Sequence, residues 1–276
     1  MTHYSTLHTH LDAGILTILL NRPEKRNALT HQLIEDLTHA LESAPNNPLC
    51  RVVILTGAGS AFCAGLDLDH LRAMAEKSGQ QSFDQEYQAD AQRIATLLRT
   101  LYDLPLPTIA AVNGPAIAGG MGIATLCDFT LAVSEAKFGY TEVRIGFIPA
   151  IVSAFLRTQI GDKRARDLLL TGRLLSAEEA MALGLVTRIV PEPELMPEAR
   201  ALAGRLQRNS PAAMEATKRL LGTFADHSFS DDIEAAIRAS VRARNTDDFR
   251  EGVQAFLEKR EPRWPSLPKP QAPRPS

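Results

Sequence analysis

Residues 108–149 constrain the fold of this chain more than any other stretch, and they read TIAAVNGPAIAGGMGIATLCDFTLAVSEAKFGYTEVRIGFIP. The short, β-branched apolar run at 108–112 predicts a buried strand, which an Asn-Gly-Pro sequence ends. A glycine pair then opens a segment with helical apolar spacing, and residues 129–133 predict a second buried strand. Strand, glycine turn, helix and strand in this order predict an α/β fold.

The glycine turn also predicts a site for negative charge. Gly119 and Gly120 stand where the helix begins, so unpaired backbone N–H groups are exposed there and a ligand can approach the main chain closely. Such helix starts favour anions. Glu142 follows in the irregular loop at 138–149 and offers a base, although glycine pairs also serve helix packing and a loop glutamate is more often a solvated charge.

A second motif supports a catalytic function. Residues 58–68 read AGSAFCAGLDL and directly follow a strand-like run at 52–56. Together with the glycine turn, this motif resembles the enoyl-CoA hydratase/isomerase (crotonase) superfamily, and the likeness spans almost the whole chain. The resemblance implies an α/β fold built as a spiral of ββα units, followed by a C-terminal all-helical trimerisation region.

Composition excludes several other classes. The 276 residues are 45% apolar and 22% charged, as in soluble globular proteins. The 30 basic and 32 acidic residues balance, so we expect no nucleic-acid partner. The start lacks a signal-peptide pattern and no run of 18 apolar residues occurs, so we expect no membrane association and a cytoplasmic location. Three widely spaced cysteines predict neither disulfides nor a Cys-x-x-Cys metal site.

The remaining elements follow from turn and capping signals. The predicted elements are a hairpin at 7–20, a helix at 83–104, a helix at 163–170 with Asp162 as its N-cap, a capping box at 176–179, and C-terminal helices at 211–221, 231–244 and 247–259. We expect a catalytic core at 1–197, a helical oligomerisation region at 198–264 and a disordered proline-rich tail at 265–276. The polar stretch at 76–84 is a loop candidate that would shape an acyl pocket.

The resemblance assigns an oxyanion hole. A thioester carbonyl gains negative charge when a proton leaves its α-carbon or water adds at its β-carbon, and two fixed N–H donors stabilise that charge. By resemblance, these donors are the backbone N–H groups of Leu66 and Gly119. Ala64 and Gly65 would line the same channel.

The resemblance also implies a coenzyme A site. Its candidate residues are Lys25, Arg26, Ala28, Ala64, Gly65, Leu66, Asp67, Gly120, Phe256 and Lys259. Without the family, Lys25 and Arg26 are ordinary loop charges and Phe256 is a core residue of an amphipathic helix. Asp67, Asp69 and His70 also suggest a metal, but caps and surface charges explain them, so we expect no metal site.

One departure from the family pattern leaves the reaction open. Glu142 matches one of the two catalytic glutamates of typical hydratases, whereas Gly122 stands in place of the other. Hydration conveniently uses two carboxylates and moving a double bond needs one, which favours an isomerase. The segments Gly-Met-Gly and Thr-Glu-Val-Arg nevertheless resemble single-glutamate hydratases, including those similar to methylglutaconyl-CoA hydratase.

We therefore expect an enzyme of acyl-CoA metabolism that hydrates a 2-enoyl-CoA, with Glu142 as acid and base. The sequence supports a Δ3-Δ2-enoyl-CoA isomerase that uses the same glutamate almost equally well. A non-catalytic acyl-CoA-binding protein is the third alternative. We expect no cofactor beyond the coenzyme A of the substrate. The resemblance implies a homotrimer or a homohexamer.

Overall fold

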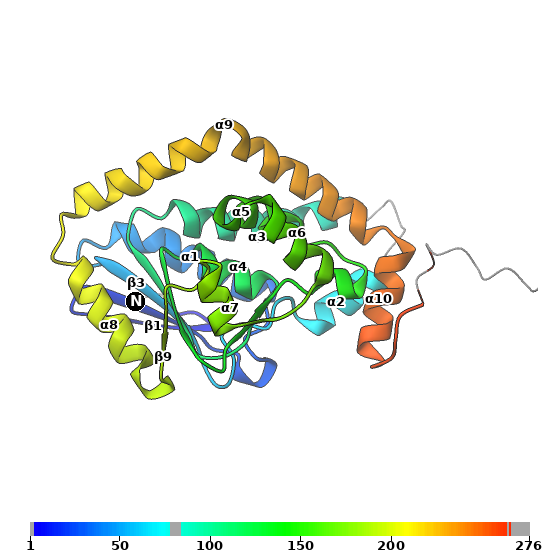
Figure 1. Cartoon of the computed structure of the whole chain (residues 1–276), viewed down its shortest axis with the longest axis horizontal. Coiled ribbons are helices and arrows are strands. Elements are labelled where there is room, and N and C mark those ends of the chain that lie inside the picture. Colours follow the sequence, from blue (N-terminus) through cyan, green and yellow to red (C-terminus); the bar gives the residue numbers. More distant parts are fainter. Residues whose placement is uncertain (1–2, 78–83, 264, 266–276) are drawn as a thin grey trace, which may run out of the picture.

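The structure is a computed structural model that describes residues 3–77, 84–263 and 265. Most of the predicted pocket-shaping loop at 76–84 therefore lies outside the described residues, as does nearly all of the tail predicted at 265–276. The described chain is a mixed α/β protein, as the sequence predicts (Figure 1).

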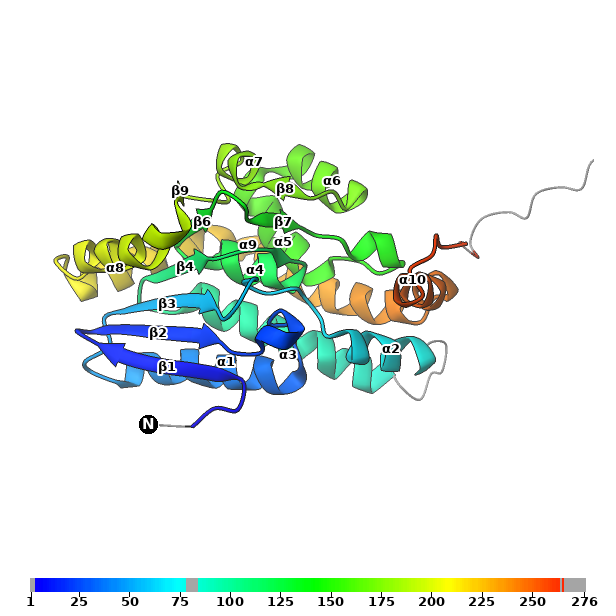
Figure 2. The ribbon, with the colours of Figure 1, turned by 90° about the horizontal axis from the view of Figure 1, so that it is seen from below.

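A six-stranded sheet lies at the centre of the fold (Figure 2). Its order is β1-β2-β3-β4-β6-β9, formed by Leu7–Asp12, Ile15–Leu20, Val52–Gly57, Thr108–Val112, Phe129–Val133 and Arg188–Val190. β1 and β2 form the predicted antiparallel hairpin, and the other neighbours pair in parallel. β4 is buried along its whole length, which explains why it reads as a continuous apolar run.

A small second sheet carries the segments that will form the site. It consists of β5 (Ala116–Ile117), β7 (Lys137–Gly139) and β8 (Leu175–Ser176) in the order β5-β7-β8. The helix α4 (Gly119–Leu126) follows β5 directly. The predicted capping box is confirmed at the start of α7 (Ala177–Ala182), where the Ser176 and Glu179 side chains each accept from the other's backbone N–H.

Helices surround the sheets. They are α1 (His31–Ser43), α2 (Leu68–Lys77), α3 (Asp84–Asp103), α5 (Ala150–Ile160), α6 (Asp162–Thr171), α8 (Leu195–Leu206) and α10 (Asp247–Leu257), with short 3-10 turns η1 (Pro23–Lys25), η2 (Ala44–Asn46), η4 (Glu142–Ile145) and η5 (Glu192–Glu194). α8 packs on β3, β4 and β6, and α1 packs on α3. Gly161, and not the predicted Asp162, is the N-cap of α6.

The C-terminal part differs from the sequence prediction in one respect. α9 (Pro211–Arg244) is one helix of 34 residues, where the sequence predicted two shorter ones. It arches over α3 and α5 and packs on both (Figure 1). Most helix stability in proteins comes from such packing, which outweighs the weak local propensity of the middle segment. No helix in the described ranges combines the length and apolar character needed to cross a membrane.

Candidate active site

The polar turn and the first motif are joined through their backbones. The N–H of Ala64 donates to the carbonyl of Arg26 at 3.0 Å, and the N–H of Leu29 donates to the carbonyl of Gly65 at 2.7 Å. The N–H of Asp67 donates to the carbonyl of Leu29 at 3.0 Å. The segment predicted to lie near coenzyme A therefore runs beside the loop predicted to carry the first oxyanion donor.

The glycine turn is joined to both the first motif and the acidic loop. The N–H of Ile117 donates to the carbonyl of Cys63 at 2.9 Å. On the other side, β5 pairs with β7, and the N–H of Ala118 donates to the carbonyl of Gly139 at 2.7 Å. Three stretches that are distant in sequence thus meet, and Glu142 follows closely after β7.

The backbone geometry supports two free N–H donors. Gly65 and Asp67 both bond to Leu29, so the N–H of the intervening Leu66 faces the opposite side. Gly119 is the first residue of α4, where an N–H has no intrahelical acceptor. Within the described chain, no hydrogen bond uses the N–H of Leu66 or of Gly119.

Each donor follows a residue with positive φ. Gly65 has φ +87° and Ala118 has φ 52°. Alanine rarely adopts this conformation, and such strain is characteristic of functional sites. A Cβ atom at Gly65 would lie 3.0 Å from the Cβ of Ala118, so the two turns that aim the donors also touch each other.

Leu66, Gly119 and Glu142 line one cavity of about 380 Å³. Its wall is mainly apolar, and its remaining polar groups include Ser240 and Arg244 from α9. Both are buried, and the Arg244 guanidinium lies 5.3 Å from the ring centre of Phe147. Sequence reasoning missed Ser240 and Arg244, because polar residues in a helical pattern are ordinarily assigned to its solvated face.

Glu142 has the environment of a general base. Its Oε2 atom is fully buried and has no hydrogen-bond partner. Burial disfavours the charged form and raises the pKa of Glu142 to about 7. A base of this pKa is poised for proton transfer at neutral pH.

This pKa predicts the pH dependence of the reaction. Proton abstraction needs the carboxylate, so kcat/KM should fall about tenfold for each pH unit below 7 and level off above it. Initial rates between pH 5 and 9, with circular dichroism to confirm folding, would measure this profile. A profile that stays flat down to pH 5 would show that Glu142 titrates with an ordinary pKa or is not the base.

Apolar side chains surround Gly122, which stands where typical hydratases have the second glutamate. A Cβ atom at Gly122 would lie 2.9 Å from Val152 Cγ1 and 3.6 Å from Leu98 Cδ1. Among the described residues that line the cavity, Glu142 is the sole carboxylate. Any chemistry in this cavity that needs a carboxylate therefore relies on Glu142 alone.

The predicted coenzyme A residues at and beside the polar turn differ in exposure. Lys25 and Arg26 are exposed, and the Nζ of Lys25 lies 3.4 Å from Oδ2 of Asp69. Ala28 is buried, as is Asp67, which accepts from the Arg22 guanidinium at 3.0 Å. Arg22 also donates to the carbonyl of Ala28, so this ion pair, which sequence reasoning missed, holds the two loops together.

The other predicted coenzyme A residues have different surroundings. Ala64 lines the cavity, as does Phe256, which is 52% exposed. Lys259 is exposed and lies just beyond α10. Gly120 is buried against Cys63, whose carbonyl oxygen would overlap an added Cβ, and it does not line the cavity.

The three cysteines are free and buried. Burial raises the pKa of Cys63 to about 12, so its thiol is protonated at neutral pH. Cys63 therefore lacks the thiolate character of a nucleophile, although it lies beside the site.

The η4 turn, which begins with Glu142, packs against α10. A Cβ atom at Gly252 would overlap the carbonyl carbon of Ile145, so α10 packs directly on the η4 turn that carries Glu142. We expect Gly252→Ala to lower the free energy of unfolding by about 1–3 kcal/mol, as overpacking does, and to lower turnover by displacing η4.

The matched control is Gly204→Ala in α8, where an added Cβ meets nothing within 4 Å. It should raise stability by about 0.5–1 kcal/mol and leave turnover unchanged. Urea unfolding and initial rates of both variants would test this. Equal behaviour of the two variants would contradict the close contact between α10 and η4.

Comparison with known proteins assigns the family. The family model described as enoyl-CoA hydratase/isomerase matches residues 10–267. The Thermus thermophilus protein named "Putative enoyl-CoA hydratase" is 42% identical over 91% of this chain and 97% of its own length. Enoyl-CoA hydratase EchA19 of Mycobacterium tuberculosis is 38% identical over 90% and 92%.

Solved structures agree. The crystal structure of an enoyl-CoA hydratase/isomerase from Xanthobacter autotrophicus Py2 superimposes with a TM-score of 0.85 at 28% identity, covering 94% of this chain and 98% of that one. The match spans both the sheet region and the C-terminal helices. The chain therefore belongs to the enoyl-CoA hydratase/isomerase (crotonase) superfamily and is an enzyme of this type.

Proposed function

We propose that this enzyme hydrates a 2-enoyl-CoA to a 3-hydroxyacyl-CoA. One observation carries the proposal: a buried carboxylate with a pKa near 7, Glu142, lines the same cavity as the two N–H donors of Leu66 and Gly119. The donors fit a thioester oxygen that becomes negative, and the carboxylate fits a water molecule that must lose a proton.

In the proposed reaction, Glu142 takes a proton from water while the water oxygen bonds to C3. The C2–C3 double-bond electrons move towards the thioester, and the carbonyl oxygen becomes an enolate held by the N–H groups of Leu66 and Gly119. The protonated Glu142 then returns a proton to C2 and the carbonyl re-forms. One carboxylate performs both transfers, and the net change is the addition of one water molecule.

Isomerisation is the second candidate, and the apolar surroundings of Gly122 favour it. Val152 and Leu98 lie beside that position, and the described residues that line the cavity provide one carboxylate. Glu142 would take a proton from C2 of a 3-enoyl-CoA and return it to C4, with the same enolate as intermediate. This exchange needs no second base and no bound water.

The deciding experiment follows the absorbance of the conjugated thioester with the purified full chain. One cuvette holds a 2-enoyl-CoA and the other its 3-enoyl isomer. Loss of absorbance in the first, with the 3-hydroxy product identified by mass spectrometry, is the expected result. A rise in the second cuvette alone would replace hydration by isomerisation. No change in either cuvette across short, branched and long acyl groups would favour a non-catalytic acyl-CoA-binding protein.

The acyl group and the assembly remain predictions. The likeness to methylglutaconyl-CoA hydratase is one such prediction, and a panel of branched and straight acyl-CoA substrates would test it. We also propose that Lys25 and Arg26 contact coenzyme A phosphates and that the enzyme forms trimers or hexamers. Sedimentation equilibrium would measure the number of subunits.

A further inference from the structure

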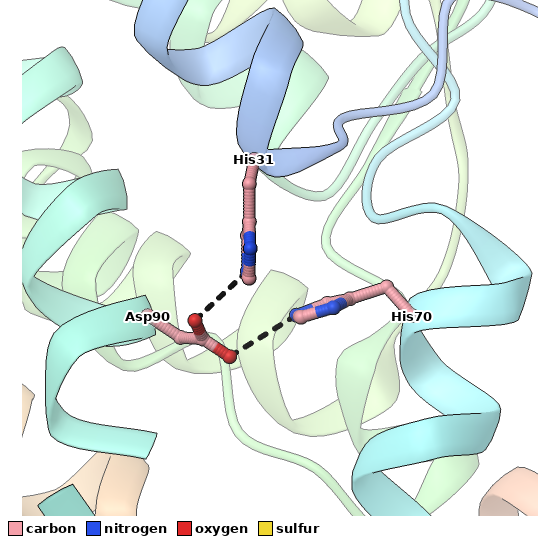
Figure 3. A group of neighbouring side chains, drawn as sticks. All are labelled: His31, His70 and Asp90. Carbon is pink, nitrogen blue, oxygen red and sulfur yellow. Dashed lines mark ion pairs between the residues drawn. The ribbon is translucent and has the colours of Figure 1, made fainter. Parts of the chain in front are cut away.

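Two histidines and a buried aspartate come together from three helices (Figure 3). His31 is the first residue of α1, His70 lies in α2 and Asp90 lies in α3. His31 Nε2 is 2.8 Å from Asp90 Oδ1, and His70 Nε2 is 3.2 Å from Asp90 Oδ2. One donor atom from each of the three residues lies within 4.8 Å of the other two.

The contacts within this cluster are not well-formed hydrogen bonds. His31 Nε2 and Asp90 Oδ2 are both fully buried atoms without a hydrogen-bond partner, despite the short separations. Such groups are costly when left unsatisfied. The side chain of Asp90 is only 5% exposed, and its Oδ1 also accepts from Arg93 at 2.8 Å. The buried Oδ2 thus faces the His70 imidazole without a donor aligned to it, while Oδ1 faces His31.

We propose that His31, His70 and Asp90 bind one divalent transition-metal cation of the zinc class. Two imidazoles and one carboxylate, with a fourth position open to water, form a ligand set that zinc accepts. Ligand atoms around tetrahedral zinc lie about 3.3 Å apart, given bond lengths of about 2.0–2.1 Å. The separations of 2.8 and 3.2 Å are close to that value, so small side-chain rotations suffice.

The electrostatics of the cluster suit a cation. Neutral imidazole is the form that binds metal, and the Nε2 atoms of His31 and His70 both lie against the Asp90 carboxylate. Asp90 supplies the carboxylate of the ligand set, and its side chain is only 5% exposed. Arg93 and Arg244 are opposing positive charges near Asp90, and Arg93 binds Oδ1 and leaves Oδ2 available.

The location of the three residues suggests that a bound metal would stabilise the wall of the cavity. Leu29, Leu71 and Ile94 line the cavity, and they lie two residues before His31, one after His70 and four after Asp90. A bound cation would therefore fix the starts of α1 and α2 to α3 directly behind the apolar wall. His31, His70 and Asp90 do not line the cavity themselves, so the metal would act on its shape and rigidity.

The test is a zinc titration of the chelator-treated full chain by calorimetry, repeated with cobalt(II) to report coordination by visible absorption. We expect one metal ion per chain and the intense ligand-field bands of a four-coordinate site. His70→Ala and His31→Gln should each weaken binding by more than about tenfold, since even losses outside the ligand set cost 10–100-fold. Zinc should also raise the melting temperature of the parent chain and not that of the two variants.

Two controls separate this site from other histidines. The double variant His8→Ala/His10→Ala removes the histidine-rich start, and His39→Ala removes an exposed histidine of α1 that bonds Tyr4. Both should bind like the parent. Absence of stoichiometric binding, or binding that survives His31→Gln and His70→Ala, would overturn the proposal. If His70→Ala does not fold, the partly exposed His31 still decides the question through His31→Gln. None of these readouts uses enoyl-CoA turnover.

Discussion

Glu142→Gln should lower kcat by about 10² to 10⁴-fold, the usual contribution of a general acid or base, while acyl-CoA binding survives. The expected loss is the same for hydration and for isomerisation, because Glu142 is the sole carboxylate among the described residues that line the cavity. Glutamine keeps the shape of the side chain and removes its basicity. Initial rates give kcat and KM, and calorimetry with the product gives the binding constant.

The same substitution should stabilise the protein above neutral pH. The native pKa of about 7 lies above the ordinary value of 4.5, so the native state binds this proton more tightly than the unfolded chain does. Stability therefore falls as pH rises from about 4.5 to about 7, because the buried carboxylate must ionise. Glutamine avoids this loss, and the melting temperature of Glu142→Gln should exceed that of the parent most clearly at pH 8.

A matched control is Glu135→Gln, which alters an exposed glutamate that precedes β7. It should change neither turnover nor the pH dependence of melting. Undiminished turnover in Glu142→Gln would remove this glutamate from the mechanism. Reduced turnover with an unchanged pH dependence of the melting temperature would show that burial does not raise the pKa of Glu142 in the native state.

The elements predicted most accurately from the sequence are those that local chemistry determines. β4 and β6 occupy the predicted ranges because strands that are buried along all or nearly all of their length read as short apolar runs. The capping box at Ser176 was recognisable because its two hydrogen bonds lie within four residues. α9 could not be predicted as one helix, because its continuity depends on packing against α3 and α5.

The site likewise combines features that local sequence predicts with features that depend on tertiary contacts. Leu66, Gly119 and Glu142 were predicted through motif resemblance, and all three line one cavity, while their catalytic roles stay predictions. The strain at Ala118 was not predictable, because a positive φ at alanine has no sequence signal and follows from the pairing of β5 with β7. Arg244 was missed for a related reason, since it reaches the cavity from a helix more than 100 residues later in the chain.

The cluster in Figure 3 shows the limit of spacing arguments. Asp67, Asp69 and His70 suggested a metal because they are adjacent in sequence, yet Asp67 pairs with Arg22 and Asp69 with Lys25. His70 instead faces residues from two other helices. Ligand sets assembled from separate helices leave no local pattern, so only the tertiary structure reveals them.

Gly65→Ala should lower kcat by about 10² to 10³-fold, as loss of an oxyanion donor does. Gly65 has φ +87°, and an added Cβ would lie 3.0 Å from Ala118 Cβ and 3.1 Å from the Ile117 carbonyl oxygen. Relief of this contact requires the first loop and the glycine turn to separate by a few tenths of an ångström. The N–H groups of Leu66 and Gly119 follow directly after the colliding residues, so their relative aim is lost without any change at Glu142.

Gly184→Ala separates the effect of the left-handed backbone conformation from that of the steric contact at Gly65. Gly184 has a nearly equal φ of +81°, but an added Cβ there meets nothing within 4 Å. Both variants should lose about 1–2 kcal/mol of stability from the left-handed conformation, whereas only Gly65→Ala should lose turnover. Urea unfolding and kcat measured side by side test this, with the pH profile as a further readout. Gly65→Ala should keep the apparent pKa near 7, because the base is untouched while the donors are displaced. If folded Gly65→Ala turned over as fast as Gly184→Ala, the paired N–H groups would not be the oxyanion hole.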